Sequence, residues 1–274
     1  MRQLSSTFLF LLMLVGLTRG ITGFAVGGIL AARARPGHRT LAMASTIGDL
    51  SVLHLNDGYG GEGLVLGPPG GEYKNVVIWL HGLGDTANGW AGAMPQFKVP
   101  QTKFILPTAE SIPVTMNGGF RMPAFFDLKS LDPNVPEDAA GIQKTSKRIV
   151  KMIETETAEG KAVVIGGFSQ GGAIALHVAM RTATPLAGCV AASTWMPLRG
   201  DYPEALTAMG KRVPVQMCHG ERDEVVLFPI GNLTRQVLSE YGIDVAFEAY
   251  AGMGHSACEP EMETIGAFLR KCFS

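Results

Sequence analysis

Charged residues are scarce in this chain of 274 residues: Asp, Glu, Lys and Arg together make up 17%, and the formal net charge is -1. The body of the chain contains no recurring basic block, so the composition indicates neither a nucleic acid nor an anionic surface as a partner. Internal repeats and low-complexity segments are also lacking. Hydrophobic residues make up 46%, which suits one large domain with a buried core; two domains are an alternative that nothing requires. Any partner is therefore expected to be small or apolar.

Cysteines are few and follow no pattern. The four of them lie late in the chain, with no C-x-x-C pair and no other metal-like spacing: Cys189, Cys218, Cys258 and Cys272. We expect reduced and mostly packed thiols, and no metal site. A disulfide is the alternative if the chain enters an oxidising compartment.

The N-terminus lacks a hydrophobic run long enough for a membrane span, but it has the pattern of a targeting segment. Arg2 precedes an apolar run at residues 8–17, and small residues follow, as in a secretory signal peptide. A weaker apolar stretch at residues 21–32 leads into a basic, acid-free segment at residues 31–40, as in transit peptides. We expect residues 1–45 to be a targeting extension, removed or disordered, that directs the chain to the secretory pathway or an organelle. A bipartite leader of the plastid type is one form of this prediction.

The alternatives for this segment stay open. It would also fit a signal anchor, or a true start at Met43 with a cytoplasmic protein. We therefore leave residues 1–45 out of the fold prediction, which concerns residues 46–274.

From about Thr46, short apolar runs alternate with helix-like segments. This alternation predicts an α/β fold, with a mostly parallel sheet of about seven strands and helices on both faces. Strands are expected at residues 51–55, 76–80, 103–107, 162–166, 187–192, 214–218 and 244–250, and helices at residues 136–158, 170–180, 230–241 and 260–272. The irregular stretch 108–136 is too long for an ordinary connection. We call it the predicted lip, because such loops usually form binding features.

The pentapeptide Gly167-Phe168-Ser169-Gln170-Gly171 follows an expected strand and precedes an expected helix. In the α/β-hydrolase fold a sharp strand-to-helix turn of this kind projects a serine hydroxyl above the sheet, and small residues two places away on each side avoid a clash. The pentapeptide pattern alone is common by chance. Its strand–turn–helix context predicts that Ser169 is a nucleophile.

A serine becomes nucleophilic at neutral pH only when a base takes its proton. Of the six histidines, His255 stands in a glycine-containing loop after the last expected strand, where the α/β-hydrolase fold places its base. His81 and His219 each end a strand and precede a glycine. We interpret both as structural, although they lie near the same edge of the sheet.

The acid that orients the histidine should lie between Ser169 and His255 in the sequence. Asp223 follows the expected strand 214–218 and fits this position. Its neighbours Glu221 and Glu224 are the competing acids. We predict Asp223.

An oxyanion hole needs two backbone N–H groups. Gln170, directly after the predicted nucleophile, should supply one. Leu83 should supply the other, from the glycine-containing loop after the strand 76–80. The alternative for such a loop is a phosphate cradle, but no Gly-Lys-Ser/Thr ending is present.

Several motifs together resemble the acyl-protein thioesterase and small carboxylesterase (lysophospholipase-like) family. The similarity runs over about residues 50–273 and is carried by His81-Gly82-Leu83-Gly84-Asp85-Thr86 with Trp90, Met122-Pro123 with Phe126-Asp127, Gly166-Gly167-Phe168-Ser169-Gln170-Gly171-Gly172, Trp195-Met196-Pro197-Leu198, His219-Gly220 with Asp223, and Gly254-His255-Ser256. The resemblance implies hydrolysis of S-palmitoyl thioesters on proteins and of other acyl esters, without a cofactor or metal. It places the triad on Ser169, Asp223 and His255, and the oxyanion donors on Leu83 and Gln170.

The chain departs from the family in three places. Phe125 stands where a tryptophan is usual, Leu227 stands where a proline is usual, and the N-terminal extension is absent from the cytosolic members. The first departure would alter the acyl channel. The last leaves the cytoplasm, usual for the family, as the alternative location.

Apolar residues of the predicted lip and of the segment after residue 194 would line a groove for a fatty chain. The predicted substrate-binding residues are Met122, Phe125, Phe126, Trp195 and Leu198, with Met116 and Phe120 nearby in sequence. Ordinary core and lid packing is the alternative for this set.

Three functions follow in order of preference. The first is a serine hydrolase of acyl thioesters and esters, acting on S-palmitoylated proteins. The second is a broad carboxylesterase or lysophospholipase, and the remote third is a ligand receptor on the same fold. The expected partner is an acylated protein or a lipid ester, with a peripheral membrane contact and without nucleic acid; the sequence does not indicate an oligomeric state.

Overall fold

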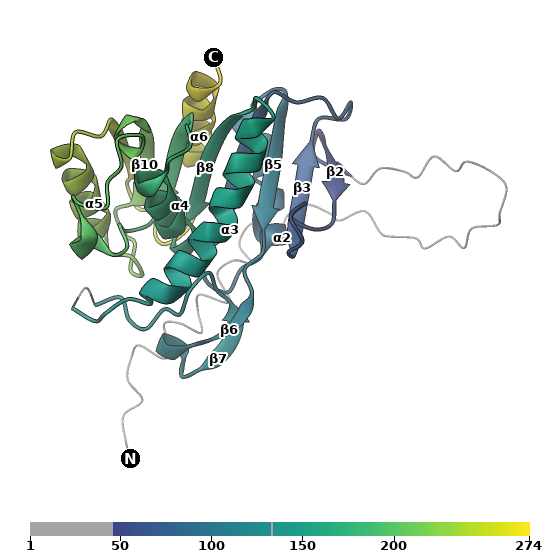
Figure 1. Cartoon of the computed structure of the whole chain (residues 1–274). Coiled ribbons are helices and arrows are strands. Elements are labelled where there is room, and N and C mark those ends of the chain that lie inside the picture. Colours follow the sequence, from purple (N-terminus) through teal and green to yellow (C-terminus); the bar gives the residue numbers. More distant parts are fainter. Residues whose placement is uncertain (1–45, 133) are drawn as a thin grey trace.

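The computed structural model describes residues 46–132 and 134–274 (Figure 1). The expected targeting extension, residues 1–45, lies outside the described residues, so its removal and its boundary stay predictions. Within the described ranges, no helix is both long enough and apolar enough to cross a membrane.

A nine-stranded sheet forms the centre of the fold, in the order β1-β2-β3-β5-β4-β8-β9-β10-β11. The six strands from β5 to β11 pair in parallel, whereas β1, β2 and β3 pair antiparallel at one edge. The strands are β1 (Thr46–Ile47), β2 (Leu50–His54), β3 (Gly63–Gly67), β4 (Asn75–Leu80), β5 (Thr102–Pro107), β8 (Ala162–Phe168), β9 (Gly188–Ala192), β10 (Val215–Gly220) and β11 (Val245–Tyr250). The predicted α/β class and mostly parallel sheet are confirmed.

All seven expected strands are present, with ends shifted by at most two residues, but the sheet has two more. β3 begins at Gly63 and ends at Gly67, and Gly61 lies just before it, so its sequence resembles a turn. It forms a strand because β2 and β5 pair with it on either side. β1 is only two residues long, too short for a periodic signal. Tertiary pairing, rather than local pattern, accounts for both.

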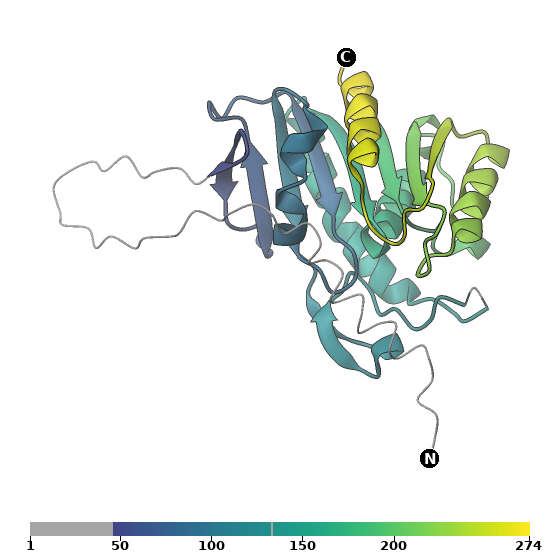
Figure 2. The same ribbon diagram turned by 180° about the vertical axis from the view of Figure 1, so that it is seen from behind.

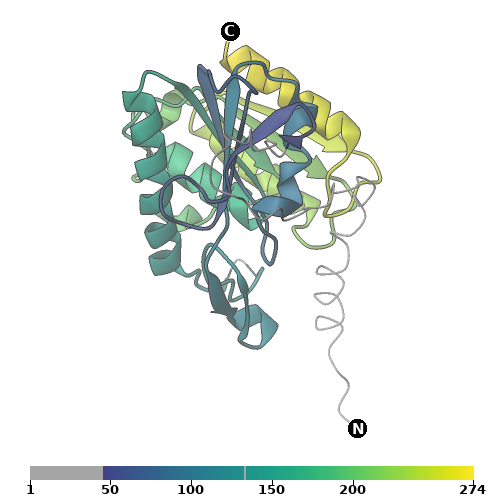
Figure 3. The ribbon, with the colours of Figure 1, turned by 90° about the vertical axis from the view of Figure 1, so that its right-hand side faces the viewer.

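The predicted lip is not wholly irregular. It contains a second, two-stranded sheet, β6 (Ser111–Val114) and β7 (Phe120–Pro123), joined through a short 3-10 turn and two glycines with positive φ, Gly118 and Gly119. Figures 1 and 3 show this hairpin projecting beyond the body of the fold. The strands are four residues each, and Pro113 and Pro123 interrupt the usual strand signal.

Helices cover both faces of the sheet, as predicted. One face carries α3 (Ala139–Ala158), α4 (Gln170–Arg181) and α5 (Phe228–Glu240), and the opposite face carries α2 (Ala87–Ala91) and α6 (Glu259–Cys272) (Figures 2 and 3). Two apolar clusters fill the two interfaces: Ile142 and Ile174 belong to the first, Trp90 and Ile265 to the second. The sheet is therefore buried on both sides, as its apolar strands require.

Helix α3 shows how the sequence sets an end. The carboxylate of Asp138 accepts a hydrogen bond from the N–H of Gly141, which caps the first turn. The helix therefore begins at Ala139, three residues later than expected from Pro136.

None of the four cysteines is paired, and all four lie in the described residues. Cys189 on β9 and Cys218 on β10 are buried, and burial raises the pKa of both thiols. These two are packed thiols that stay protonated, as expected.

Candidate active site

Ser169 lies at the turn between β8 and α4, in a strained backbone conformation with φ 54° and ψ -120°. The turn depends on its two flanking glycines. A Cβ on Gly167 would lie 2.5 Å from the carbonyl carbon of Gly171, and a Cβ on Gly171 would lie 2.3 Å from the carbonyl oxygen of Leu80. Both positions therefore exclude any side chain, which is the reason the sequence pattern requires glycine there.

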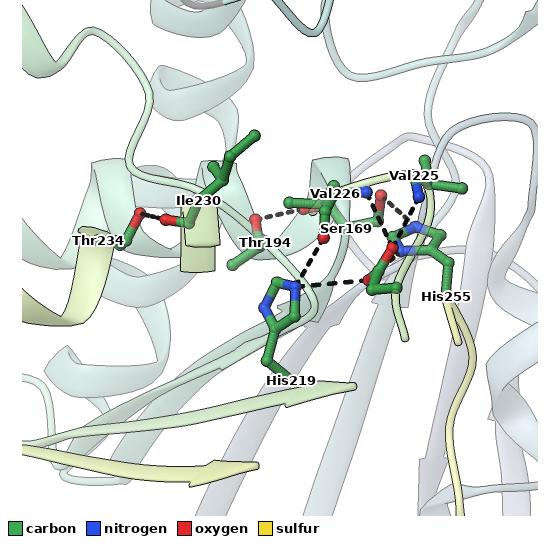
Figure 4. Close-up of polar contacts among 9 residues, drawn as sticks. Ser169, Thr194, His219, Val225, Val226, Ile230, Thr234 and His255 are labelled. Carbon is green, nitrogen blue, oxygen red and sulfur yellow. Dashed lines mark hydrogen bonds and ion pairs between the residues drawn. The ribbon is translucent and has the colours of Figure 1, made fainter. Parts of the chain in front are cut away.

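Two hydrogen bonds hold the backbone of Ser169 in this conformation. Its N–H donates to the carbonyl of Ala192 at 2.9 Å, and its carbonyl accepts from the hydroxyl of Thr194 at 2.6 Å (Figure 4). Thr194 was not anticipated. Its one sequence signal is its place as the second of two polar residues, Ser193 and Thr194, that follow the fully apolar strand β9.

The predicted nucleophile, base and acid meet in one hydrogen-bonded chain (Figure 4). His255 Nε2 lies 2.9 Å from Ser169 Oγ, and His255 Nδ1 lies 2.8 Å from Asp223 Oδ2. Because the carboxylate only accepts, Nδ1 carries the proton and Nε2 is free to accept the serine proton. The three side chains come from the segments that follow β8, β10 and β11, at the edge where parallel strands present their carboxyl ends.

Asp223 is 4% exposed, and its other oxygen is also satisfied: Oδ1 accepts the N–H groups of Val225 and Val226, each at 2.9 Å. The competing acids Glu221 and Glu224 are both exposed to solvent. Only Asp223 of the three contacts His255.

The predicted oxyanion donors flank the serine. A Cβ on Gly82 would lie 3.5 Å from Ser169 Cβ, so the loop that carries Leu83 runs beside the nucleophile. Gln170 is the first residue of α4, whose positive end faces the same place. Within the described residues, neither the N–H of Leu83 nor that of Gln170 donates to another protein group. Both amides are free to bind a ligand oxygen.

His81 braces this loop. Its Nε2 accepts the N–H of Ala109 at 3.0 Å, so Nδ1 carries the proton and donates to the carbonyl of Gly82 at 2.6 Å. Burial lowers the pKa of His81 to about 4, which keeps the ring neutral. These contacts agree with the structural interpretation of His81.

The predicted groove residues divide into two groups. Met122, Trp195 and Leu198 are half-buried, and the sulfur of Met122 lies 3.6 Å from a Cβ placed on Gly84, beside the oxyanion loop. Phe125 and Phe126 are 5% and 1% exposed. Both side chains lie in the apolar core. In this structure they therefore fit the alternative of ordinary core packing.

The side chains that hold this region were not foreseen. Gln170 Oε1 accepts the N–H of Phe125, and Gln170 Nε2 donates to the carbonyl of Phe126, both at 2.9 Å. Glu137 accepts from the indole N–H of Trp195 at 3.0 Å and from the N–H of Leu198 at 2.6 Å. The middle of the predicted lip is therefore tied to α4, and the residue directly after the lip is tied to the segment after β9.

Two surface cavities lie away from the triad. One, of about 330 Å³, is lined by residues that include Tyr73 and Lys161, and the other, of about 260 Å³, by residues that include Leu50 and Phe104. Neither contains a predicted groove residue, so the acyl groove stays a prediction. In the described part of the chain, no group of three or more His, Cys, Asp or Glu side chains is placed to hold a metal ion.

This fold, with a serine turn between a parallel strand and a helix, defines a hydrolase of the α/β-hydrolase class. More narrowly, the chain belongs to the Phospholipase/Carboxylesterase family, whose model matches residues 63–273.

Several similar proteins carry thioesterase names. The chain is 38% identical to acyl-protein thioesterase 1 of Gibberella zeae over 74% of this chain and 93% of that protein. It is 39% identical to acyl-protein thioesterase 1 of Neurospora crassa, with coverage of 75% and 89%. Among solved structures, Zea mays acyl-protein thioesterase 2 has a TM-score of 0.73 and 29% identity, with coverage of 78% and 100%. Arabidopsis thaliana SOBER1 has a TM-score of 0.70 and 30% identity, with coverage of 73% and 99%. The resemblance stated from the motifs is confirmed.

Proposed function

We propose that this chain is an acyl-protein thioesterase that removes S-palmitoyl groups from proteins. The observation that carries the proposal is the chain of hydrogen bonds from Asp223 through His255 to Ser169, in a fold whose relatives are named as acyl-protein thioesterases. In this proposal Ser169, Asp223 and His255 form the triad, and the N–H groups of Leu83 and Gln170 form the oxyanion hole.

In the first half of the reaction, Ser169 Oγ attacks the acyl carbonyl while His255 Nε2 takes its proton. The carbonyl oxygen becomes negative and accepts hydrogen bonds from the N–H groups of Leu83 and Gln170. The intermediate collapses with release of the cysteine sulfur, to which His255 returns the proton. Ser169 is left acylated.

In the second half, water attacks the acyl-enzyme, with His255 again as the base. The fatty acid leaves, and Ser169 regains its proton. Asp223 keeps the imidazole in the required tautomer and stabilises the imidazolium form in both halves. The chemistry needs only these side chains and two amides.

The test is Ser169→Ala in the fragment of residues 46–274. We expect loss of turnover on an S-palmitoylated peptide and loss of labelling by a fluorophosphonate, because the probe reacts only with an activated serine. Labelling that persists in the variant would overturn the assignment of Ser169. A matched control is Ser256→Ala, an exposed serine next to His255, which should keep both activities.

A broad carboxylesterase or lysophospholipase is the second candidate, because the family model itself is described as Phospholipase/Carboxylesterase. Rates on an S-palmitoylated peptide, a lysophospholipid and short p-nitrophenyl esters separate the two. A thioesterase prefers the peptide by kcat/KM. Multiple turnovers on any of the three exclude a ligand receptor.

We extend the proposal to a groove and a membrane contact. Met122, Trp195 and Leu198 would line the acyl groove, and Phe125 and Phe126 would do so only if the predicted lip moves. Phe120 on the hairpin is 70% exposed, which supports a peripheral contact with the membrane that carries acylated proteins. Phe120→Glu should reduce binding to phosphatidylcholine vesicles without slowing hydrolysis of a soluble ester; unchanged vesicle binding would contradict the contact.

The location is a separate proposal. Residues 1–45 would direct the chain to the secretory pathway or an organelle, supported by the apolar run at residues 8–17 and the basic, acid-free segment that follows it. Imaging of the full chain and of residues 46–274, both tagged at the C-terminus, tests this. The same diffuse pattern for both would contradict it.

A further inference from the structure

We propose that His219 is a positioning residue of the active site: it closes the loop of residues 220–226 so that Asp223 faces His255. The inference rests on the proposed function, because it assigns His219 a role through the catalytic acid. It also replaces the interpretation of His219 as merely structural.

The geometry around the acid carries the inference. His219 is the next-to-last residue of β10 and is 0% exposed. Its Nε2 lies 2.7 Å from the carbonyl oxygen of Val226 and 3.5 Å from Asp223 Oδ2 (Figure 4). A carbonyl only accepts hydrogen bonds, so Nε2 carries the proton and donates it to Val226.

Val226 is thereby held through both of its backbone polar groups. Its N–H donates to Asp223 Oδ1, and its carbonyl accepts from His219. The loop that leaves β10 at Gly220 therefore returns to β10 at the ring of His219. Without that ring, the N–H groups of Val225 and Val226 would no longer have a fixed place, and the carboxylate that they hold would turn away from His255.

The charge state of His219 suits this role. Burial lowers the pKa of His219, against smaller raising effects of the Val226 hydrogen bond and of Asp223. The ring is therefore neutral, and its Nδ1 has no hydrogen-bond partner among the described residues. A second cation beside Asp223 would compete with the imidazolium form of His255 for the carboxylate, whereas a neutral N–H orients without competing.

Helix α5 fixes the ring from the other side. A Cβ on Gly231 would lie only 2.3 Å from His219 Nδ1, and the ring of Phe228 meets that of His219 edge-on at 6.0 Å. Glycine weakens a helix interior relative to alanine. Its presence at position 231 is explained by the space that the imidazole needs.

The experiment compares His219→Gln with His219→Asn. The amide nitrogen of Gln can reach the place of Nε2, whereas that of Asn reaches only the place of Nδ1. We measure kcat and KM on a short p-nitrophenyl ester, per active site counted by fluorophosphonate labelling, together with the labelling rate and Tm. We expect kcat and labelling rate to fall about tenfold in the Asn variant, as for loss of one hydrogen bond, with KM little changed. The Gln variant should recover most of the loss.

The matched control is His177→Asn on α4. His177 is also buried, its pKa is also lowered by burial, to about 4, and its Nδ1 also has no partner among the described residues. It takes no part in the hydrogen bonds of the triad. The Tm of the His177→Asn variant should fall, and its kcat per labelled site should stay unchanged. A second variant, Gly231→Ala, should lower kcat by displacing the ring although alanine is the better helix former.

Wild-type kcat per labelled site in the His219→Asn variant, measured well below its Tm, would overturn the inference. So would a Gln variant as slow as the Asn variant. The proposed function fails separately, by absence of thioester turnover in the unmutated enzyme. The labelling rates of the variants would still test His219 in that case, because the probe needs only an activated Ser169.

Discussion

Asp223 and Glu261 are buried acids that precede and follow His255 in the chain, one in the loop after β10 and the other in the first turn of α6. Asp223 accepts three hydrogen bonds, from His255 and from two backbone N–H groups. Glu261 is 0% exposed, and neither of its oxygens has a hydrogen-bond partner among the described residues. The two carboxyls are thus similarly buried, but only that of Asp223 is surrounded by hydrogen-bond donors.

The difference shows what burial alone does to an acid. Burial raises the pKa of Glu261 to about 8, against a smaller lowering effect of the backbone of Cys258, because a buried carboxylate with so little hydrogen bonding is poorly solvated. Glu261 is therefore mostly protonated at neutral pH and is buried as a neutral group. Asp223 can serve as a carboxylate because the loop supplies the donors that water would otherwise supply.

The largest expected effect comes from removing the charge of Asp223. Asp223→Asn keeps the shape but offers an amide to His255, which favours the wrong tautomer of the imidazole. We expect kcat at pH 7 to fall by about 10⁴-fold, with little change in Tm. Steady-state kinetics on a short ester measures it. Glu224→Gln, in the same loop, is the control and should keep full activity; a loss below tenfold in the Asn variant would remove the distinction between the two acids.

The next effect is on stability and depends on pH. The carboxyl of Glu261 ionises near pH 4.5 in the unfolded chain and near pH 8 in the folded one. Folding therefore loses stability as pH rises from 4.5 to 8, and the loss is complete above 8. Glu261→Gln removes this loss, so it should raise the free energy of unfolding by on the order of a few kcal/mol at pH 9 relative to its effect at pH 5.

Urea unfolding at pH 5, 7 and 9 measures that difference. Glu259→Gln is the matched control, because it is an exposed acid of the same helical turn. A difference that does not vary with pH would mean that Glu261 has donors after all, and the contrast with Asp223 would collapse.

The smallest expected effect concerns Glu137, a half-buried acid with two donors. Glu137→Gln removes the negative charge that strengthens the hydrogen bonds from Trp195 and Leu198. The predicted groove should therefore become less ordered, while the triad keeps its geometry. We expect KM for a palmitoyl thioester to rise about three- to tenfold with kcat nearly unchanged. Kinetics on butanoyl and palmitoyl thioesters tests this. Equal changes for both chain lengths would argue against a role in holding the acyl chain.

Each of the three residues that form the hydrogen-bonded chain has a local signal in the sequence. Ser169 has glycines at fixed distances, and Asp223 and His255 each follow an apolar strand of the parallel sheet. Parallel strands present their carboxyl ends at one edge, so three loops distant in sequence meet there. The fold class and the four long helices follow from periodicity in the same way.

The rest depends on tertiary packing and has no local signal. Phe125 and Phe126 have the composition of a groove, yet Phe125 packs on His81 at 4.8 Å, and the side chain of Gln170 binds the backbone of both phenylalanines. Glu261 stands where helices commonly carry an exposed acid, so its burial could not be read from its position. The contacts of His219 and Thr194 likewise join segments that only the fold brings together.

The order of β8, β10 and β11 along the chain has a consequence for biosynthesis. The oxyanion loop and Ser169 leave the ribosome first, Asp223 follows, and His255 comes last of the triad. Folding during synthesis begins from the N-terminal side, so the serine turn can form while its base is still missing. A nascent chain would therefore hold an inert hydroxyl until β11 has docked beside β10, and its hydrolytic activity would begin only when nearly the whole domain has been synthesised.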